Sequence, residues 1–407
     1  MENYMFLGFA KVDISPEKSV EMVGYTRDDN KSRGIWHPLI AETAIWTFLK
    51  EKCCLVTIDH IGFMIEDANV LRDMIAKELN ITREKVMLCF SHTHSSVNVT
   101  DEPDYFHYLC DKVVSCVKEA EKNTEPVEIE WDCVEADIGC NRRDETGALD
   151  KRIGILKVVN KDTKALLLIL LRVTAHANVL PYDNYLISSD YIGVTREKLE
   201  EKYGCSIMIT QGAAGNVSAR FADSEKALYQ MADSIATVVD ESIKHLKPVA
   251  VERMEMYSTP IEFRSDLPTL ERAKEIKEEA FRENQIDGAE WLKEVERLKK
   301  NNVSYQTVES EIQYFHINEG CLCGVPNEIM CELALEVEKA CNNKQVYFGA
   351  YTNGCTGYLP TAKEYMKGGF EVLHSYLIYY IYHGFVMPLN RESADKLTKC
   401  VVKNKRC

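Results

Sequence analysis

The chain has 407 residues, enough for one large or two ordinary domains, and 45% of them are apolar, which can supply a substantial core. Its 49 basic and 64 acidic side chains give a net charge of −15, without a basic, aromatic-interleaved stripe, which argues against nucleic acid as a partner. The 15 cysteines lack paired C-x-x-C spacing, and neither a signal peptide nor a transmembrane helix is predicted. We therefore expect a cytoplasmic protein with reduced thiols.

Strand-like and helix-like runs alternate through most of the chain. Short apolar runs predict strands at 42–50, 53–59, 86–91, 127–138, 152–160, 165–175, 206–210 and 346–351. Apolar residues at helical spacing predict helices at 66–80, 104–122, 190–203, 224–246 and 372–389. A polar hairpin at 161–164 lies among the βαβ units, so we expect an α/β fold with mixed sheet layers flanked by helices.

Residues 268–301 form a separate, strongly charged stretch, dense in Glu, Lys and Arg with apolar positions such as Ala273 and Ile276. The pattern predicts a solvated helical pair, broken around Asp287-Gly288, with a structural role and no chemistry. No internal repeat or low-complexity linker is present. We therefore expect one domain over 1–407 that carries a helical insertion at about 268–301.

The triplet His92-Thr93-His94 directly follows the predicted strand 86–91. Side chains two apart on an extended chain point the same way, so both imidazoles can face one cavity where the strand ends. Two neutral imidazoles that converge on one point favour a zinc site. In the alternative interpretation, one histidine caps the strand and the other is solvated.

His176 ends the predicted strand 165–175 in the same manner. Strand ends in open α/β sheets commonly meet at one ligand-binding edge, which makes His176 a candidate partner of the His92 triplet. A hydrogen-bonded histidine at the rim of a sheet is the other interpretation.

The segment 211–218 follows the predicted strand 206–210 and contains Gly212, Gly215 and Ser218. Its small residues let the backbone approach a ligand and offer amide donors for an anion or oxyanion. A tight turn that needs glycine explains them equally well. Ser218 could position a nucleophile or steady an oxyanion, or it could cap the following helix.

Two later segments carry one candidate side chain each. Glu328 opens a predicted helix, where a carboxylate suits the positive end of the helix dipole without any metal. Tyr358 lies in the glycine-rich loop 353–361, after the predicted strand 346–351, and a loop tyrosine ordinarily packs and hydrogen-bonds.

Taken in order, these segments resemble the catalytic domain of the neutral, non-lysosomal ceramidase family, which are zinc-dependent amide hydrolases. The resemblance covers most of the chain, and the ordered set of motifs is more specific than any single one. The matching segments are 8–16, Gly24-Tyr25, 56–59, 91–95, Asn141-Arg142-Arg143, the His176 segment, 215–218, 326–328 and 353–365.

The resemblance implies a catalytic zinc site and assigns roles to its residues. The implied zinc ligands are His92, His176, Glu328 and Tyr358. It further implies that His94 lies beside the metal as a proton carrier or extra contact, that Arg142 contacts the substrate, and that Ser218 is catalytic. Asp59 and Asp190 are candidates for orienting the histidines, and either could equally cap a helix or hold a turn. Water activated by the zinc would then hydrolyse a linear amide bond.

The sequence departs from the family pattern at three places. Residues 95–98, Ser-Ser-Val-Asn, replace the usual Gly-Pro-Gly-Gly. Asn216 replaces an aspartate, and Ala219-Arg220 replaces Pro-Asn. The C-terminal β-sandwich domain of the full-length enzymes is also not expected in this chain. These departures spare the implied metal ligands and bear on the substrate pocket.

Three hypotheses follow. The first is a zinc amidohydrolase that cleaves an N-acyl bond in a ceramide-like sphingolipid or in a smaller amide. The second is a TIM-barrel metal amidohydrolase, although strands and a helix precede the histidine pair and the hairpins disagree with eight βα units. The third is a catalytically silent protein of the same fold that binds a metal or ligand. The sequence does not indicate the oligomeric state.

Overall fold

The computed structural model describes residues 4–406, and its largest element is a mixed sheet of eight strands. The strand order is β4-β3-β2-β1-β5-β7-β8-β9, with parallel pairing only between β3 and β4 and between β8 and β9. The strands are β1 (Met5–Asp13), β2 (Ile40–Phe48), β3 (Glu51–Ile58), β4 (Val86–Phe90), β5 (Thr124–Glu135), β7 (Arg152–Asn160), β8 (Leu166–Val173) and β9 (Ser206–Gln211). The predicted hairpin at 161–164 joins β7 to β8.

A second, four-stranded sheet packs face to face against the first. Its order is β11 (Met254–Asp266), β12 (Tyr305–Ile317), β13 (Gly320–Gly324) and β15 (Val346–Gly349). Large aromatic side chains fill the space between the sheets; the rings of Trp46 and Phe315 lie 5.9 Å apart, and those of Trp131 and Tyr347 lie 5.8 Å apart. The two sheets therefore share one apolar core.

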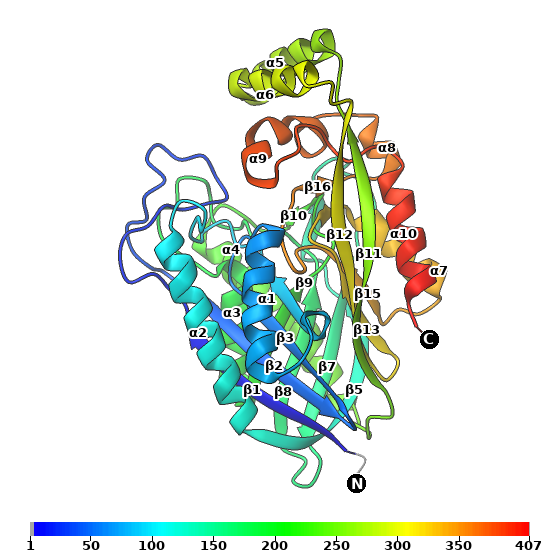
Figure 1. The fold of residues 1–407 in the computed structure, drawn as a ribbon. Coiled ribbons are helices and arrows are strands. Elements are labelled where there is room, and N and C mark those ends of the chain that lie inside the picture. Colours follow the sequence, from blue (N-terminus) through cyan, green and yellow to red (C-terminus); the bar gives the residue numbers. More distant parts are fainter. Residues whose placement is uncertain (1–3, 407) are drawn as a thin grey trace.

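Helices cover the outer face of each sheet (Figure 1). The larger sheet carries α1 (Ile65–Leu79), α2 (Pro103–Lys122), α3 (Asp190–Tyr203) and α4 (Glu225–His245). The smaller sheet carries α7 (Cys331–Cys341) and α10 (Ser393–Asn404). The prediction of an α/β fold with mixed sheet layers flanked by helices is confirmed. The TIM-barrel alternative is wrong, because most neighbouring strands of the described chain are antiparallel.

The charged insertion lies between β11 and β12 as two helices, α5 (Leu270–Asn284) and α6 (Ala289–Lys300), at the top of Figure 1. Its apolar face is buried against the C-terminal segment that contains α9 (Tyr376–His383). Trp291 is fully buried and donates its indole N–H to the carbonyl of Val386 at 2.7 Å. The predicted helical pair is therefore present, but one of its faces is packed rather than solvated.

The helix predicted at 372–389 is shorter than expected. The structure has a π-helical turn η2 (Phe370–His374), preceded by the short helix α8 (Ala362–Tyr365) and followed by α9. The helix ends at Gly384, which has a φ of 80°, a left-handed conformation that glycine adopts without steric cost. Among residues 4–406, no helix has the length and apolar character that a membrane crossing requires.

Two short ribbons bring distant segments together at one end of the sheets. β6 (Gly139–Asn141) pairs antiparallel with β10 (Val217–Ala219), and β14 (Glu328–Ile329) pairs parallel with β16 (Tyr358–Leu359). A 3-10 turn, η1 (Arg83–Lys85), leads into β4. The ribbons carry Ser218, Glu328 and Tyr358, and Arg142 directly follows β6.

Candidate metal centre

Three histidines from two strand ends converge at one point. His92, His94 and His176 each offer a ring nitrogen that lies within 4.8 Å of the other two. They meet because β4 and β9, which are opposite edges of the large sheet, contact each other, so the sheet curls on itself. Gln211, at the end of β9, donates its side-chain amide to the carbonyl of Ser91 at 3.2 Å and so ties the two edges together. The predicted meeting of the two histidine segments is confirmed.

Backbone carbonyls orient two of the three imidazoles. Nδ1 of His92 lies 2.6 Å from the carbonyl oxygen of Ile61, and Nδ1 of His176 lies 2.7 Å from that of Ala214. Because a carbonyl only accepts, each Nδ1 donates a proton to it, and Nε2 is the ring nitrogen left to face the centre. This is the arrangement in which a histidine binds a metal through Nε2.

Neither of the two aspartates considered for orienting the histidines has a histidine among its hydrogen-bond or ion-pair partners in the described chain, so the structure favours their structural alternative. Asp59 forms an ion pair with Arg196 at 2.5 Å. Asp190 accepts hydrogen bonds from the backbone N–H groups of Leu180 and Tyr191. Both carboxylates are buried, and backbone or arginine donors satisfy them.

Glu328 joins the histidines at the centre. One of its carboxylate oxygens, Oε2, lies 3.2 Å from Nε2 of His92 and 3.5 Å from Nε2 of His176. Tyr358 is held beside Glu328 because the two residues are paired across β14 and β16. The structure therefore brings Glu328 into contact with two of the histidines and places Tyr358 next to it on the ribbon.

Tyr351 was missed by the sequence reasoning. Its hydroxyl donates to Oε2 of Glu328 at 3.3 Å, and its ring stacks on His92 with centroids 4.1 Å apart. Tyr351 has a φ of 53°, unusual for a bulky residue and typical of functional segments. No sequence pattern signals it, since it follows a strand as an ordinary aromatic residue.

The donor set fits a metal ion. Nε2 of His176 and both ring nitrogens of His94 are buried without a hydrogen-bond partner among the described residues. Burial, followed by the neighbouring His92 or Arg142, lowers the pKa of His94 and of His176 well below the usual value, so both rings are neutral. Neutral imidazoles and a carboxylate are ligand types that zinc binds, and the Tyr358 side chain lies next to that carboxylate on the β14–β16 ribbon.

Arg142, predicted to contact substrate, lies directly behind Tyr358. Its Nη2 donates to the Tyr358 hydroxyl oxygen at 3.1 Å and to the carbonyl of Gly215 at 2.6 Å. Burial alone would lower its pKa, but Tyr358, Glu371 and Glu328 raise it overall, so the guanidinium is charged. The arginine is therefore a fixed cation at the edge of the candidate centre.

Ser218, predicted to be catalytic, is placed differently. It lies on β10 and is half-buried between the buried Val217 and Ala219, and it is not among the described residues that line the cavity. The backbone around it has a clear structural role, because the Val217 carbonyl accepts from the backbone N–H of His176 at 2.9 Å. A catalytic role for Ser218 stays a prediction.

A cavity of about 1100 Å³ opens onto the centre. Its walls include His92, His94, Glu328 and Tyr358. Further walls come from residues 22–26, from 97–100 and from α9. The tip of the insertion, 284–287, also lines it. The insertion therefore reaches the cavity wall, and its structural role without chemistry stays a prediction.

Comparison with solved structures identifies the fold as that of the neutral ceramidases. The chain superposes on a neutral ceramidase from Pseudomonas aeruginosa with a TM-score of 0.75 and 17% identity, covering 99% of this chain and 74% of that one. A ceramidase complexed with C2 gives a TM-score of 0.76 at 15% identity, covering 98% of this chain and 74% of that one. No protein-family model and no curated protein matches the sequence. The resemblance stated from the sequence is thus confirmed for the fold.

Proposed function

We propose that the protein is a zinc-dependent hydrolase that cleaves a linear N-acyl amide bond. The observation that carries this proposal is the contact of Glu328 Oε2 with the Nε2 atoms of His92 and His176, at 3.2 and 3.5 Å, at the base of a large cavity. The ceramidase fold supports it. We also propose that residues 1–407 act as a single hydrolase domain with the helical insertion as part of its cavity wall.

His92, His176, Glu328 and Tyr358 would hold the zinc ion, leaving a position for water and substrate. When bound, zinc supplies Lewis-acid chemistry that polarises a carbonyl group and activates water. The carbonyl contacts of His92 and His176 would keep their Nε2 atoms directed at the ion.

His94 would transfer a proton from the attacking water to the departing amine. Its ring is neutral and faces the other two histidines, and its nitrogens have no partner among the described residues. A neutral imidazole can accept a proton from the attacking water and return it to the departing amine nitrogen, which would otherwise leave as an unstable anion. Arg142 would keep Tyr358 in place and face the substrate carbonyl with a fixed positive charge.

The cavity favours an uncharged amide with a hydrocarbon chain. Its volume of about 1100 Å³ suits a lipid-sized ligand, and α9 lines it with Leu377, Ile378 and Ile381 among other apolar and aromatic residues. None of the described lining residues is lysine or arginine, whereas Asp287 and Glu290 are acidic. An anionic head group would be repelled by these two carboxylates. Ceramide-like sphingolipids and other neutral N-acyl amines meet this requirement.

The test measures release of fatty acid from neutral N-acyl amines and from N-acyl amino acids of matched chain length. We expect turnover of the neutral substrates, reduced at least 100-fold in His94→Ala, because general acid–base groups contribute about 100-fold or more. The matched control is His60→Ala, since His60 lines the same cavity but its ring nitrogens are engaged by Val97 and Gly62. Zinc-loaded protein that releases no fatty acid from any of these amides would contradict the proposal and favour a silent binding protein.

A further inference from the structure

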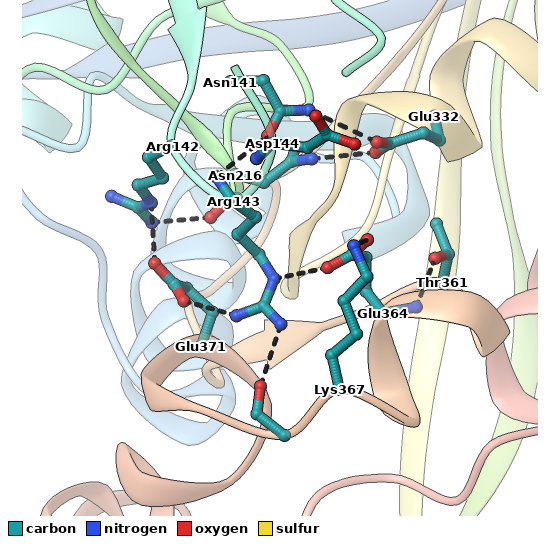
Figure 2. A network of polar contacts seen from close by, with 12 residues as sticks. Asn141, Arg142, Arg143, Asp144, Asn216, Glu332, Thr361, Glu364, Lys367 and Glu371 are labelled. Atoms are coloured by element: carbon teal, nitrogen blue, oxygen red, sulfur yellow. Dashed lines mark hydrogen bonds and ion pairs between the residues drawn. The ribbon is translucent and has the colours of Figure 1, made fainter. Parts of the chain in front are cut away.

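Two neighbouring arginines on the loop after β6 share one carboxylate from the C-terminal segment (Figure 2). Nε of Arg142 lies 3.0 Å from Oε1 of Glu371, and Nη1 of Arg143 donates to Oε2 of Glu371 at 2.8 Å. Glu371 lies on the π-helical turn η2, a type of irregularity that recurs at functional sites. The carboxylate therefore bridges two cations with a separate oxygen for each.

The two arginines face different parts of the molecule. Among the described residues, the hydrogen bonds of the Arg143 side chain go to the C-terminal segment: to Glu364 at 2.7 Å, to Glu371, and to the carbonyl of Gly368 at 2.8 Å. Arg142 instead reaches the metal centre, where its Nη2 donates to Tyr358. Of the two arginines, Arg142 is therefore the one that connects Glu371 to the centre.

The positive charge of Arg142 must be compensated if a metal ion binds nearby. The Arg142 side chain is 21% exposed and its neighbours include His94 and His176, whose site is built to receive a cation. Like charges in a poorly solvated site repel strongly, so an unpaired guanidinium would oppose metal binding. Glu371 is the carboxylate that is ion-paired with Arg142, and its side chain is only 13% exposed.

We propose that Glu371 is a positioning residue for the metal centre: it holds the Arg142 guanidinium against Tyr358 and compensates its charge beside the bound ion. This inference rests on the zinc site of the proposed function. It adds a residue from η2 to the centre, and it explains why the segment 361–371 is bound to the loop 141–144 by a network rather than by a single contact (Figure 2).

The test is the zinc affinity of the full chain, measured by competition with a chromophoric chelator, which needs no activity. Glu371→Gln is expected to weaken zinc binding by about 10-fold or more, as substitutions behind metal ligands do. The matched control is Glu364→Gln, because Glu364 pairs with Arg143 and Lys367 but not with Arg142. We expect this control to bind zinc as the wild type does. Glu371→Asp, which keeps the charge on a shorter side chain, should lie between the wild type and Glu371→Gln.

A double-mutant cycle then tests whether Glu371 acts through Arg142. In the Arg142→Ala background, the further change Glu371→Gln is expected to leave zinc affinity unchanged. Equal losses in Glu371→Gln and Glu364→Gln, or an equal effect of Glu371→Gln with and without Arg142, would overturn the inference, as would a wild-type chain that binds no zinc. A protein that binds zinc with this pattern but hydrolyses no amide would overturn the proposed reaction and leave the inference standing.

Discussion

Restoring the aspartate that the ceramidase pattern has at position 216 is expected to destabilise this protein. Asn216 is fully buried, and its two side-chain atoms have distinct partners. Oδ1 accepts from the backbone N–H of Cys331 at 2.9 Å, and Nδ2 donates to Oε2 of Glu332 at 2.9 Å (Figure 2). In Asn216→Asp the donor becomes a second acceptor, so two carboxylate oxygens face each other.

The size of the expected destabilisation follows from the distance between Nδ2 of Asn216 and Oε2 of Glu332. Two unit charges 2.9 Å apart repel by about 6 kcal/mol at an effective dielectric constant of about 20. Protonating one carboxyl group relieves the repulsion, and with an ordinary pKa near 4 this costs about 5 kcal/mol at pH 8 but about 1.4 kcal/mol at pH 5. Allowing for relaxation of the side chains, we expect Asn216→Asp to lower the free energy of unfolding by about 3 kcal/mol at pH 8 and by about 1 kcal/mol at pH 5.

The assay is urea unfolding of wild type, Asn216→Asp and the double variant Asn216→Asp/Glu332→Gln at both pH values. A glutamine at 332 can donate to the new aspartate, so the double variant should recover most of the loss at pH 8. An Asn216→Asp protein as stable as the wild type at pH 8, or a double variant no better than the single one, would refute the reasoning.

Three other changes have defined outcomes. Burial raises the pKa of Glu42 to about 7 from an ordinary value near 4.5. The stabilisation that protonated Glu42 provides is therefore complete below pH 4.5 and is lost as the pH rises through 7, which lowers the free energy of unfolding by about 3 kcal/mol. Unfolding of Glu42→Gln should therefore depend less on pH, whereas exposed Glu17→Gln should retain the wild-type slope. A Cβ on Gly215 would lie 2.4 Å from the carbonyl oxygen of Glu328, so Gly215→Ala should displace this proposed zinc ligand and weaken zinc binding about 10-fold. Unchanged affinity in the chelator competition would count against the proposed centre. Trp291→Ala should lower the free energy of unfolding by about 3–5 kcal/mol and make the insertion sensitive to protease. A variant that resists protease like the wild type would show that the packing of Trp291 contributes little to holding the insertion in place.

Much of the larger sheet and its helices could be predicted because their patterns are local. The strand before His92 and the helices around it are continuous apolar or amphipathic runs. The smaller sheet was largely not predicted. Towards one end, β11 and β12 alternate buried and exposed residues, a pattern of half-buried strands that a search for short apolar runs does not detect. Their partner in the core, the inner face of the larger sheet, lies far away in the sequence.

Site residues that belong to a sequence motif could be predicted, whereas residues whose role depends only on the three-dimensional arrangement could not. His92, His94 and His176 follow strands, and the structure brings them together with Glu328. Tyr351 and Glu371 belong to no motif, because their roles arise from a left-handed backbone turn and a π-helical turn. The backbone carbonyl groups that orient the histidines could not be predicted from the sequence either, since any residue can provide a carbonyl.

The central claim is that His92, His176, Glu328 and Tyr358 hold a metal ion. The zinc content of the purified chain after equilibration with zinc tests this claim most directly. We predict one tightly bound ion per chain, its loss in His176→Ala, and its retention in His60→Ala, whose histidine lines the same cavity with both ring nitrogens engaged. A wild-type chain without stoichiometric zinc, or a His176→Ala chain that keeps it, would contradict the account.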